Sequence, residues 1–250
     1  MRTVAIANQK GGCGKTTTTV NLSTAFATLG KKVLVIDLDP QAHATIGLGK
    51  DPESLERTVY ELFTDKNVSA SMVTTDSKVE GLKLLPSNIL LSGVEFELAS
   101  MEGREYVLRK KLSEVNGTYD ICFIDCSPSL SMLTLNALVA SDEVIIPVQT
   151  HYYALEGLRQ LLETIDIVKQ RFNYDLEILG ILLTFVESRT KLSRQVQRQL
   201  REFFGELVFD TVIHKDVKLA EAPSAHEPVF TYDPECKGAI EHKILAEEIS

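Results

Sequence analysis

The chain has 250 residues, 44% of them hydrophobic and 24% charged, which is enough to bury one substantial core, and we expect a single domain over residues 1–250. A net charge of -9 excludes a generally basic nucleic-acid-binding protein, so any DNA contact needs a local patch of basic side chains. The sequence has no apolar run of about 18 residues, and its beginning, MRTVAIANQK, is strand-like at once, so we expect a cytoplasmic protein without a leader or a membrane span.

Apolar periodicity and turn residues predict alternating strands and helices along the chain. In the first half we expect a strand at 2–8, a helix at 15–29 ended by Gly30, a strand at 32–39, a helix at 51–63 begun by Asp51-Pro52, a strand at 82–87, and two helices within 88–115 broken near Gly103. In the second half we expect strands at 119–125, 142–149, 176–186 and near 207–213, and helices at 130–140, 153–171, 191–204 and from Gly238. Several strands are near-continuous apolar runs, typical of parallel strands covered on both faces. The alternation therefore predicts an α/β fold, a doubly wound and mostly parallel sheet with helices on both faces.

The stretch NQKGGCGKTT, residues 8–17, has the context of a phosphate-binding loop, because it follows a strand and opens a helix. Its glycines let backbone N–H groups approach phosphate oxygens, and the helix N-terminus adds a positive dipole end. Lys15 can neutralise the β and γ phosphates, and the Thr16 hydroxyl can ligate Mg²⁺. The expected nucleotide-binding residues here are Lys10, Gly11, Gly12, Cys13, Gly14, Lys15, Thr16 and Thr17. The first glycine of the usual template falls on Gln9, however, and a second lysine, Lys10, follows it.

Aspartates close two of the predicted strands. Asp125 ends the strand at 119–125, where a carboxylate can hold a magnesium ion through water, and Asp37 and Asp39 close the strand at 32–39. In a doubly wound sheet the ligand lies beyond the carboxyl ends of the strands, so these acids could orient an attacking water and help to hold the metal. The chain has no N-K-x-D element for reading guanine, which favours ATP over GTP.

These residues carry a family resemblance over nearly the whole chain. KGGCGKTT resembles the deviant Walker A motif K-G-G-x-G-K-[ST]-T, VLVIDLDPQAHAT resembles V-D-x-D-P-Q-x-x-x-T, and YDICFIDCSPSLSMLTLNAL resembles a Walker B and switch II stretch. SRTKLS and LAEAPSAHEPVFTYDPECKGA are similar to the late S-R-T and S-E-A-P-S-x-G-x-P segments. All five are features of the ParA/Soj partitioning ATPases of the ParA/MinD superfamily, which have the P-loop NTPase fold.

The resemblance implies an ATP-driven dimer that hydrolyses ATP slowly, with stimulation by a ParB-like or other adaptor protein. It places Lys10 on the family's lysine that reaches across the dimer to the partner's ATP, and Lys15 on the lysine that serves its own ATP. Asp39 falls on the acid needed for hydrolysis, which also lies at the metal, while Thr16 is the magnesium ligand and Asp125 the Walker B acid. A cation supplied by the partner would complete the positive charge at the γ-phosphate only when two subunits meet.

Two segments depart from the family pattern. Switch II reads Asp125-Cys126-Ser127-Pro128 where relatives have D-C-P-P, so its geometry is expected to differ slightly. Where relatives read I-P-R-N-V-R-L, this chain reads Ile213-His214-Lys215-Asp216-Val217-Lys218-Leu219. The family's proline near the adenine is thus His214, and both arginines are lysines, so we expect His214 and Lys215 beside the nucleotide.

Residues 188–201, SRTKLSRQVQRQLR, contain five basic residues and no acidic one. On a helix with about 100° per residue, the basic side chains from 191 onward fall within about 80° of one another, opposite Leu192, Val196 and Leu200. No aromatic residue interleaves them, so we expect sequence-independent contact with DNA phosphates, and a place on the nucleoid. The predicted DNA-binding residues are Arg189, Lys191, Arg194, Arg198, Arg201, Lys215 and Lys218.

Three alternatives remain open from the sequence. A MinD-like membrane-cycling regulator would end in a basic amphipathic helix, but this chain ends in the acidic GAIEHKILAEEIS, so no stable membrane anchor is expected. A metabolic or iron–sulfur enzyme, such as dethiobiotin synthetase or the nitrogenase iron protein, shares the scaffold. The four cysteines include no C-x-x-C pair, and Cys126 near switch II has no convincing second cluster ligand. Finally, ParA-like ATPases also position chemotaxis arrays and carboxysomes, so the cargo stays open.

Overall fold

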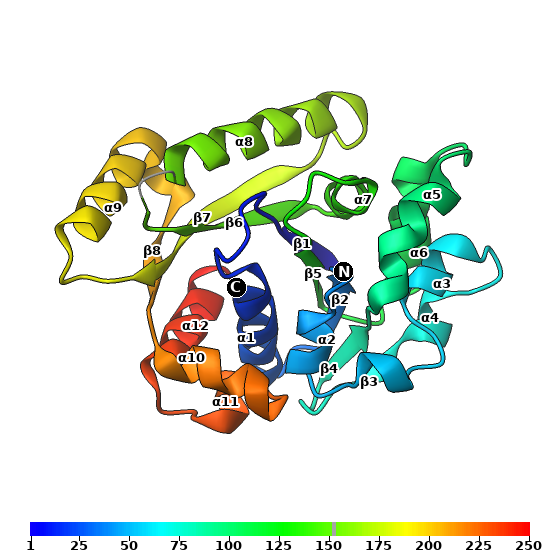
Figure 1. The fold of residues 1–250 in the computed structure, drawn as a ribbon, viewed down its shortest axis with the longest axis horizontal. Coiled ribbons are helices and arrows are strands. Elements are labelled where there is room, and N and C mark those ends of the chain that lie inside the picture. The colour runs from blue at the N-terminus through cyan, green and yellow to red at the C-terminus, as the bar shows by residue number, and fades with distance from the viewer. Residues whose placement is uncertain (152–153) are drawn as a thin grey trace.

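The computed structural model describes residues 1–151 and 154–250 (Figure 1). Within this part of the chain the strands form one eight-stranded sheet in the order β3-β4-β2-β5-β1-β6-β7-β8. The strands are β1 (Arg2–Ile6), β2 (Val33–Leu38), β3 (Thr75–Asp76), β4 (Leu82–Leu85), β5 (Ile121–Cys126), β6 (Glu143–Gln149), β7 (Glu177–Val186) and β8 (Val208–His214). Every pairing is parallel except that of β3 with β4. The doubly wound, mostly parallel α/β fold predicted from the sequence is confirmed.

Helices cover both faces of the sheet (Figure 1). One face carries α1 (Lys15–Thr28), α2 (His43–Gly47), α10 (Val217–Glu221), α11 (Val229–Tyr232) and α12 (Lys237–Glu248). The other carries α3 (Val59–Thr64), α4 (Ala70–Val73), α5 (Val94–Leu98), α6 (Val107–Ser113), α7 (Met132–Ala140), α8 (Ala154–Arg171) and α9 (Lys191–Phe204). Short 3₁₀ turns lie at Pro52–Ser54, Ile89–Gly93, Arg104–Tyr106, Gly205–Leu207 and Ala222–Ala225.

The two faces of the sheet form two separate hydrophobic cores. Every residue of β2 and of β5 is buried, which explains why both strands are nearly continuous apolar runs in the sequence. Phe123 of β5 packs against Phe26 of α1 with ring centroids 5.4 Å apart. Each fully buried side chain of this size contributes about 1.5–3 kcal/mol to the free energy of unfolding. The central strands are therefore a rigid frame for the loops at their carboxyl ends.

The register of the central strands brings the acidic ends of β2 and β5 together. Asp37 lies opposite Asp125, and on the other side of β5 Ile6 of β1 lies opposite the same residue. The loop that leaves β1 therefore starts beside both aspartates. This edge of the sheet is where a doubly wound fold binds its ligand.

The prediction of one helix over 51–63 is wrong. Asp51 caps only the 3₁₀ turn Pro52–Ser54, and Leu55 is extended. The helix α3 begins afterwards, where Thr58 and Glu61 form a reciprocal capping box. That box satisfies two backbone N–H groups at once, which fixes the helix start at Val59 rather than at the proline.

The sequence prediction also missed five short elements, β3, α2, α4, α10 and α11. Each spans two to five residues, too few for apolar periodicity to show. The break at Gly103 is confirmed: this glycine has φ of +70°, and the helices on either side, α5 and α6, are shorter than expected. Among the described residues, no helix is both long and apolar enough to cross a membrane.

Candidate functional site

Glycines shape the loop between β1 and α1. Gly12 and Gly14 have φ of +68° and +90°, in the left-handed region where a side chain would be strained. Gly14 is also the N-cap of α1, and no side chain among the described residues caps this helix. The first-turn N–H groups of α1 therefore point at a site for an anion.

Contacts from neighbouring strands hold this loop in place. The Asn8 side chain donates to the Pro147 carbonyl at 2.6 Å and accepts from the Lys10 N–H at 3.0 Å. From β7, the Thr184 hydroxyl donates to the Cys13 carbonyl at 2.7 Å. Cys13 itself is buried, and this burial raises the pKa of its thiol, so the side chain fills space while its backbone faces the loop. The phosphate loop is thus fixed before any ligand arrives.

Lys15 is buried, with 6% of its surface exposed, and its ammonium is held inside the loop. Nζ donates to the Lys10 carbonyl at 3.0 Å. The ammonium also lies 4.0 Å from Sγ of Cys13, a weak acceptor, so its three donors are only partly satisfied. Phosphate oxygens would make shorter, charge-assisted bonds to the same ammonium, so Lys15 is poised to bind an anion.

A cavity of about 370 Å³ opens in front of this loop. Its walls include the expected residues Gly11, Gly12, Gly14, Lys15, Thr16, Thr17 and Asp39, together with Gln41, His43, Pro128 and Phe185. The structure therefore brings the glycine loop, the lysine, the hydroxyls and one of the acids of β2 to a single cavity, which we call the phosphate cavity.

Two fully buried carboxylates lie behind the phosphate cavity. Burial raises the pKa of Asp125, as does the neighbouring Asp37, while hydrogen bonds from Thr16 and Thr19 lower it. Burial also raises the pKa of Asp37, against hydrogen bonds from Thr45 that lower it. The carboxylate oxygen Oδ1 of Asp125 accepts from the Thr19 hydroxyl at 3.0 Å, but Oδ2 has no hydrogen-bond partner among the described residues. Burial is the largest cause of both shifts, so both carboxyl groups lie in surroundings that disfavour their charged forms.

The unpaired Oδ2 of Asp125 is suited to accept a hydrogen bond from a water molecule that is bound to Mg²⁺. A buried, unsatisfied carboxylate oxygen is destabilising unless a cation or a water completes it. Within the described residues, no cluster of three His, Cys, Asp or Glu side chains is arranged to hold a metal alone. A magnesium ion here would therefore need Thr16 and phosphate oxygens as ligands, as octahedral Mg²⁺ bound to a nucleotide usually does.

The turn that carries Asp39 is fixed by a buried network. Asp37 accepts from the Asp39 N–H at 3.1 Å, and from the N–H and hydroxyl of Thr45 at 2.8 and 2.7 Å. The Thr45 hydroxyl accepts from the Ser87 N–H at 2.9 Å, and the Ser87 hydroxyl donates to the Asp39 carbonyl at 2.7 Å. Asp39 is thereby held at the wall of the phosphate cavity with 9% of its surface exposed.

Sequence reasoning gave no role to three of these residues, Thr19, Thr45 and Ser87. Thr45 is the last residue of the D-x-D-P-Q-x-x-x-T segment, so its place in the motif was a usable signal. Thr19 lies one helical turn after Lys15 and faces the sheet, which the helix period could also have indicated. Ser87 had no such signal, because only the pairing of β2 with β4 brings it to the turn.

A larger cavity of about 810 Å³ adjoins the phosphate cavity. It is lined by Thr17, Gln149, Thr150, His151, Phe185, Glu187, Thr190, Leu192, Ser193, Lys215, Asp216, Val217, Leu219, Ala220 and Pro223. Its size and largely apolar walls suit a nucleotide base, and we call it the base cavity. Leu192 lies on the apolar face of its helix with Val196 and Leu200, but unlike them it is 43% exposed and lines this cavity.

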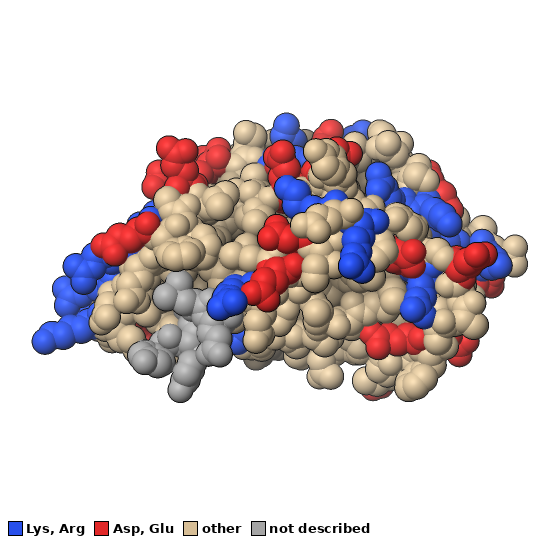
Figure 2. All heavy atoms as spheres, turned by 90° about the horizontal axis from the view of Figure 1, so that it is seen from above, with Lys and Arg blue, Asp and Glu red and all other residues tan. Residues whose placement is uncertain are grey.

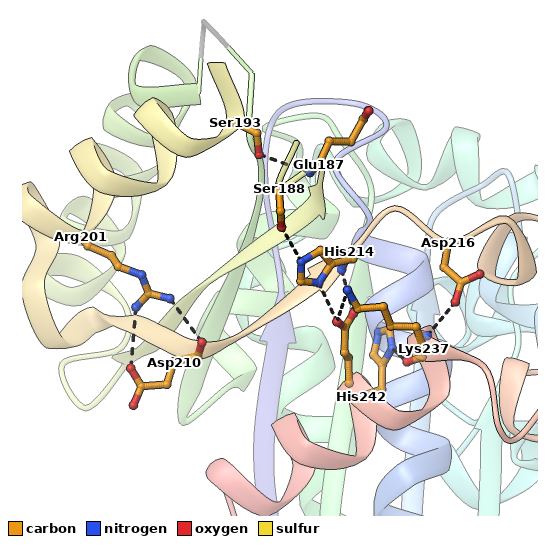
Figure 3. Close-up of polar contacts among 11 residues, drawn as sticks. Glu187, Ser188, Ser193, Arg201, Asp210, His214, Asp216, Lys237 and His242 are labelled. Carbon is orange, nitrogen blue, oxygen red and sulfur yellow. Dashed lines mark hydrogen bonds and ion pairs between the residues drawn. The ribbon is translucent and has the colours of Figure 1, made fainter. Parts of the chain in front are cut away.

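His214, expected beside the nucleotide, is not among the residues that line the base cavity. Its Nδ1 lies 2.6 Å from Oε1 of Glu241, and its Nε2 lies 2.9 Å from the Ser188 hydroxyl (Figure 3). The same Glu241 accepts from the His214 N–H at 2.8 Å, and Asp216 accepts from the N–H of Gly238. Hydrogen bonds with α12 thus hold the turn after β8 in place. His214 belongs to this hydrogen-bond network outside the base cavity, whereas the next residue, Lys215, lines the cavity.

The predicted basic surface lies on α9 at one end of the molecule (Figure 2). Arg189, Lys191, Arg194 and Arg198 are all exposed, while Val196 and Leu200 are buried against the sheet. Thr190 caps the helix by accepting from the Ser193 N–H. We call these four exposed residues the α9 basic surface.

The other three predicted DNA contacts are engaged within the protein. Arg201 donates to the carbonyls of Val208, Phe209 and Asp210 and pairs with the Asp210 carboxylate at 3.8 Å (Figure 3). Lys215 pairs with Glu187 at 3.3 Å. Lys218 pairs with Glu221 at 2.9 Å, and its ammonium lies over the Tyr232 ring. Spacing on α9 could not reveal the partners of Arg201, because they lie on β8, whereas Lys218 and Glu221 lie three residues apart on α10.

Comparisons with known proteins agree with this geometry. A family model described as an AAA domain matches residues 1–178. The sporulation initiation inhibitor protein Soj of Bacillus subtilis is 46% identical over 247 residues, which cover 99% of this chain and 97% of that protein. The chromosome partitioning protein ParA of Caulobacter vibrioides is 44% identical over 253 residues, with coverage of 100% and 94%. Among solved structures, cobyrinic acid a,c-diamide synthase from Mycobacterium smegmatis with a bound ATP analogue and magnesium superposes with a TM-score of 0.87, at 39% identity and coverage of 99% and 93%.

Proposed function

The chain belongs to the Soj/ParA family of chromosome-partitioning ATPases, and on that premise we propose that it is an ATP-dependent dimerisation switch that binds DNA without sequence preference. In this proposal the chain acts as one ATPase domain in the cytoplasm, on the nucleoid. A ParB-like or other adaptor stimulates its slow hydrolysis of ATP. The observation that carries the proposal is the position of Lys10 in a phosphate loop that already holds one lysine.

The described contacts of Lys10 are all made by its backbone. Its N–H donates to Asn8, and its carbonyl accepts from Lys15 and from the Cys13 thiol. These bonds fix the main chain of Lys10 in the loop, although Lys10 is not among the residues that line the phosphate cavity. In this proposal its partly exposed side chain serves a second copy of the chain rather than its own site.

The chemistry follows from the groups around the phosphate cavity. Lys15 and the N–H groups of α1 bind the phosphate oxygens and draw negative charge away from the bond that breaks. Asp39, held by Asp37 and Ser87, orients the attacking water. Magnesium bound at Thr16 would supply further positive charge between the phosphates. Lys10 from the partner subunit would complete the positive charge only in the dimer.

A change of Lys10 to alanine tests this division of labour. We expect the variant to bind ATP with nearly wild-type affinity, because Lys15 and the loop are intact, but to lose dimer-dependent hydrolysis. The measurements are ATP affinity by calorimetry, molar mass by light scattering with ATP, and phosphate release with DNA present. Lys31→Ala, at an exposed position outside the loop, is the control. A Lys10→Ala protein that hydrolyses ATP at the wild-type rate contradicts the proposal.

DNA binding is expected to depend on the α9 basic surface. Replacing Arg194 and Arg198 together by alanine should weaken DNA retention and lower the salt dependence, since each lost phosphate contact reduces the slope of log K against log salt by about 0.9. ATP affinity should not change, because neither residue lines the phosphate or base cavity. Lys31→Ala with Lys32→Ala removes two equally exposed charges elsewhere and should keep DNA binding. Equal loss in both double variants would mean that overall charge, not this surface, attracts DNA.

Two of the alternative functions are less well supported. A biosynthetic role like that named for the Mycobacterium smegmatis protein has the weaker likeness, since identity to it is 39% against 46% to Soj. An iron–sulfur enzyme needs a thiol that faces a second subunit, but Cys126 is 1% exposed. Chromosome or plasmid partitioning with a ParB-like adaptor is the function that we propose, and a different adaptor would indicate a different cargo.

A further inference from the structure

Phe185 stands between the phosphate cavity and the base cavity. Of the described residues that line these two cavities, only Phe185 and Thr17 belong to both. Thr17 is part of the predicted phosphate loop, whereas Phe185 is the penultimate residue of β7 and belongs to no sequence motif. A ligand that fills both cavities therefore passes between or beside Thr17 and Phe185.

The backbone of Phe185 is strained. Its φ is +49°, in the left-handed region, where a residue with a large side chain is a rare outlier. Such strain persists only where the surroundings fix the chain on both sides, and it gathers at ligand sites. Here Thr184 is bound to the Cys13 carbonyl at 2.7 Å, and the Val186 carbonyl accepts from the Lys215 N–H at 3.2 Å. The neighbours of Phe185 are thus attached to the loop between β1 and α1 and to Lys215, which lines the base cavity.

The ring of Phe185 lies against the phosphate loop. A Cβ atom built on Gly14 would be 3.5 Å from two carbons of this ring, which is van der Waals contact. The strained backbone therefore turns the ring toward Gly14 and away from the hydrophobic core. With an ordinary φ at this position, the side chain would point in another direction. The strained backbone therefore determines that the ring lies where the two cavities meet.

We propose that Phe185 is a specificity-determining residue, whose ring packs against the ribose and base of a nucleotide whose phosphates lie in the phosphate cavity. This inference rests on the proposed function, because it takes ATP as the ligand. The ring gives the site an apolar contact that inorganic polyphosphate cannot use. It therefore makes a nucleoside triphosphate bind more tightly than tripolyphosphate with the same charged groups.

The test compares ATP, ADP and tripolyphosphate binding to the full chain by calorimetry, using wild type, Phe185→Ala, Phe185→Gly and Phe185→Leu. We expect alanine and glycine to weaken ATP and ADP binding about tenfold, and to leave tripolyphosphate binding unchanged, since an aromatic contact of this kind is worth roughly one factor of ten. Leucine should retain part of the affinity. Glycine should melt at a higher temperature than alanine, because both lack the ring and only glycine is unstrained at positive φ. Phe203→Ala, at a 78% exposed ring of α9, is the control.

The outcomes separate this inference from the proposed function. Wild type that binds neither ATP nor ADP overturns the proposed function and this inference with it. Wild type that binds ATP while Phe185→Ala binds it equally well overturns the inference alone. Equal losses for ATP and tripolyphosphate would show that the ring only supports the phosphate loop, which also overturns it. If the alanine variant does not fold, the leucine variant decides by the same comparison of ligands.

Discussion

Replacement of Lys15 by alanine is expected to weaken ATP and ADP binding on the order of 100-fold, because it removes the one ammonium that is buried at the phosphate cavity. The ammonium of Lys15 already lies inside the loop, where it donates to the Lys10 carbonyl at 3.0 Å. When a nucleotide binds, a negatively charged phosphate oxygen replaces this neutral acceptor. Phosphate oxygens left opposite alanine would lose this charged partner. The measurement is calorimetric titration of both nucleotides.

The fold should survive this substitution. Lys15 makes no ion pair among the described residues, so its replacement breaks none. Lys31→Ala is the matched control, since it removes one exposed lysine away from both cavities. A Lys15→Ala protein with wild-type ATP affinity would mean that the nucleotide phosphates do not lie in the phosphate cavity.

The Asp39→Ala variant is expected to bind ATP and to remain a dimer with ATP bound. Its hydrolysis should be slower on the order of 100-fold or more, because the attacking water loses the carboxylate that orients it. Asp39 reaches the phosphate cavity from a turn held by Asp37 and Ser87, and its side chain can be removed without disturbing those bonds, which use its main chain. The ATP-bound state would then accumulate. Molar mass by light scattering with ATP, together with phosphate release, measures both effects.

Thr45→Val provides the comparison for this variant. It keeps Asp39 but removes the hydroxyl that donates to Asp37 and accepts from the Ser87 N–H, so it should slow hydrolysis less than Asp39→Ala while leaving ATP affinity unchanged. A monomeric Asp39→Ala protein in the presence of ATP would count against the trapped dimer. Wild-type hydrolysis by this variant would remove Asp39 from the chemistry.

The sheet could be predicted from the sequence because each buried strand is recognisable from a short run of neighbouring residues. Buried parallel strands are apolar runs, as in β2 and β5, and these runs are long enough to recognise. Elements of two to five residues, such as β3 and α10, carry no period of their own and form because the surrounding chain positions them. The helix at 51–63 was misplaced because Asp51-Pro52 is a start signal in sequence, while Thr58 with Glu61 is the better one in space.

The candidate site likewise has one part that neighbouring residues specify and another part that depends on contacts between distant segments. The loop between β1 and α1 was recognised from the sequence because glycines, a lysine and a threonine within ten residues indicate a phosphate site, and most of the residues named for it line one cavity. Contacts between distant segments were not predictable: Ser87 reaches Asp39 through strand pairing, and Arg201 binds the β8 carbonyls that a helical wheel does not include. The strain at Phe185 is a property of φ, which has no signature in the sequence.

The central claim, that ATP controls a dimer which holds DNA, is tested most directly by a DNA mobility-shift assay on the wild-type chain at low salt. The assay is run with no nucleotide, with ADP and with ATP, each with magnesium. Two α9 basic surfaces on one dimer bind DNA more tightly than one surface on a monomer, so the account predicts retention with ATP and little or none in the other two states. No retention with ATP, or equal retention in all three states, would contradict it.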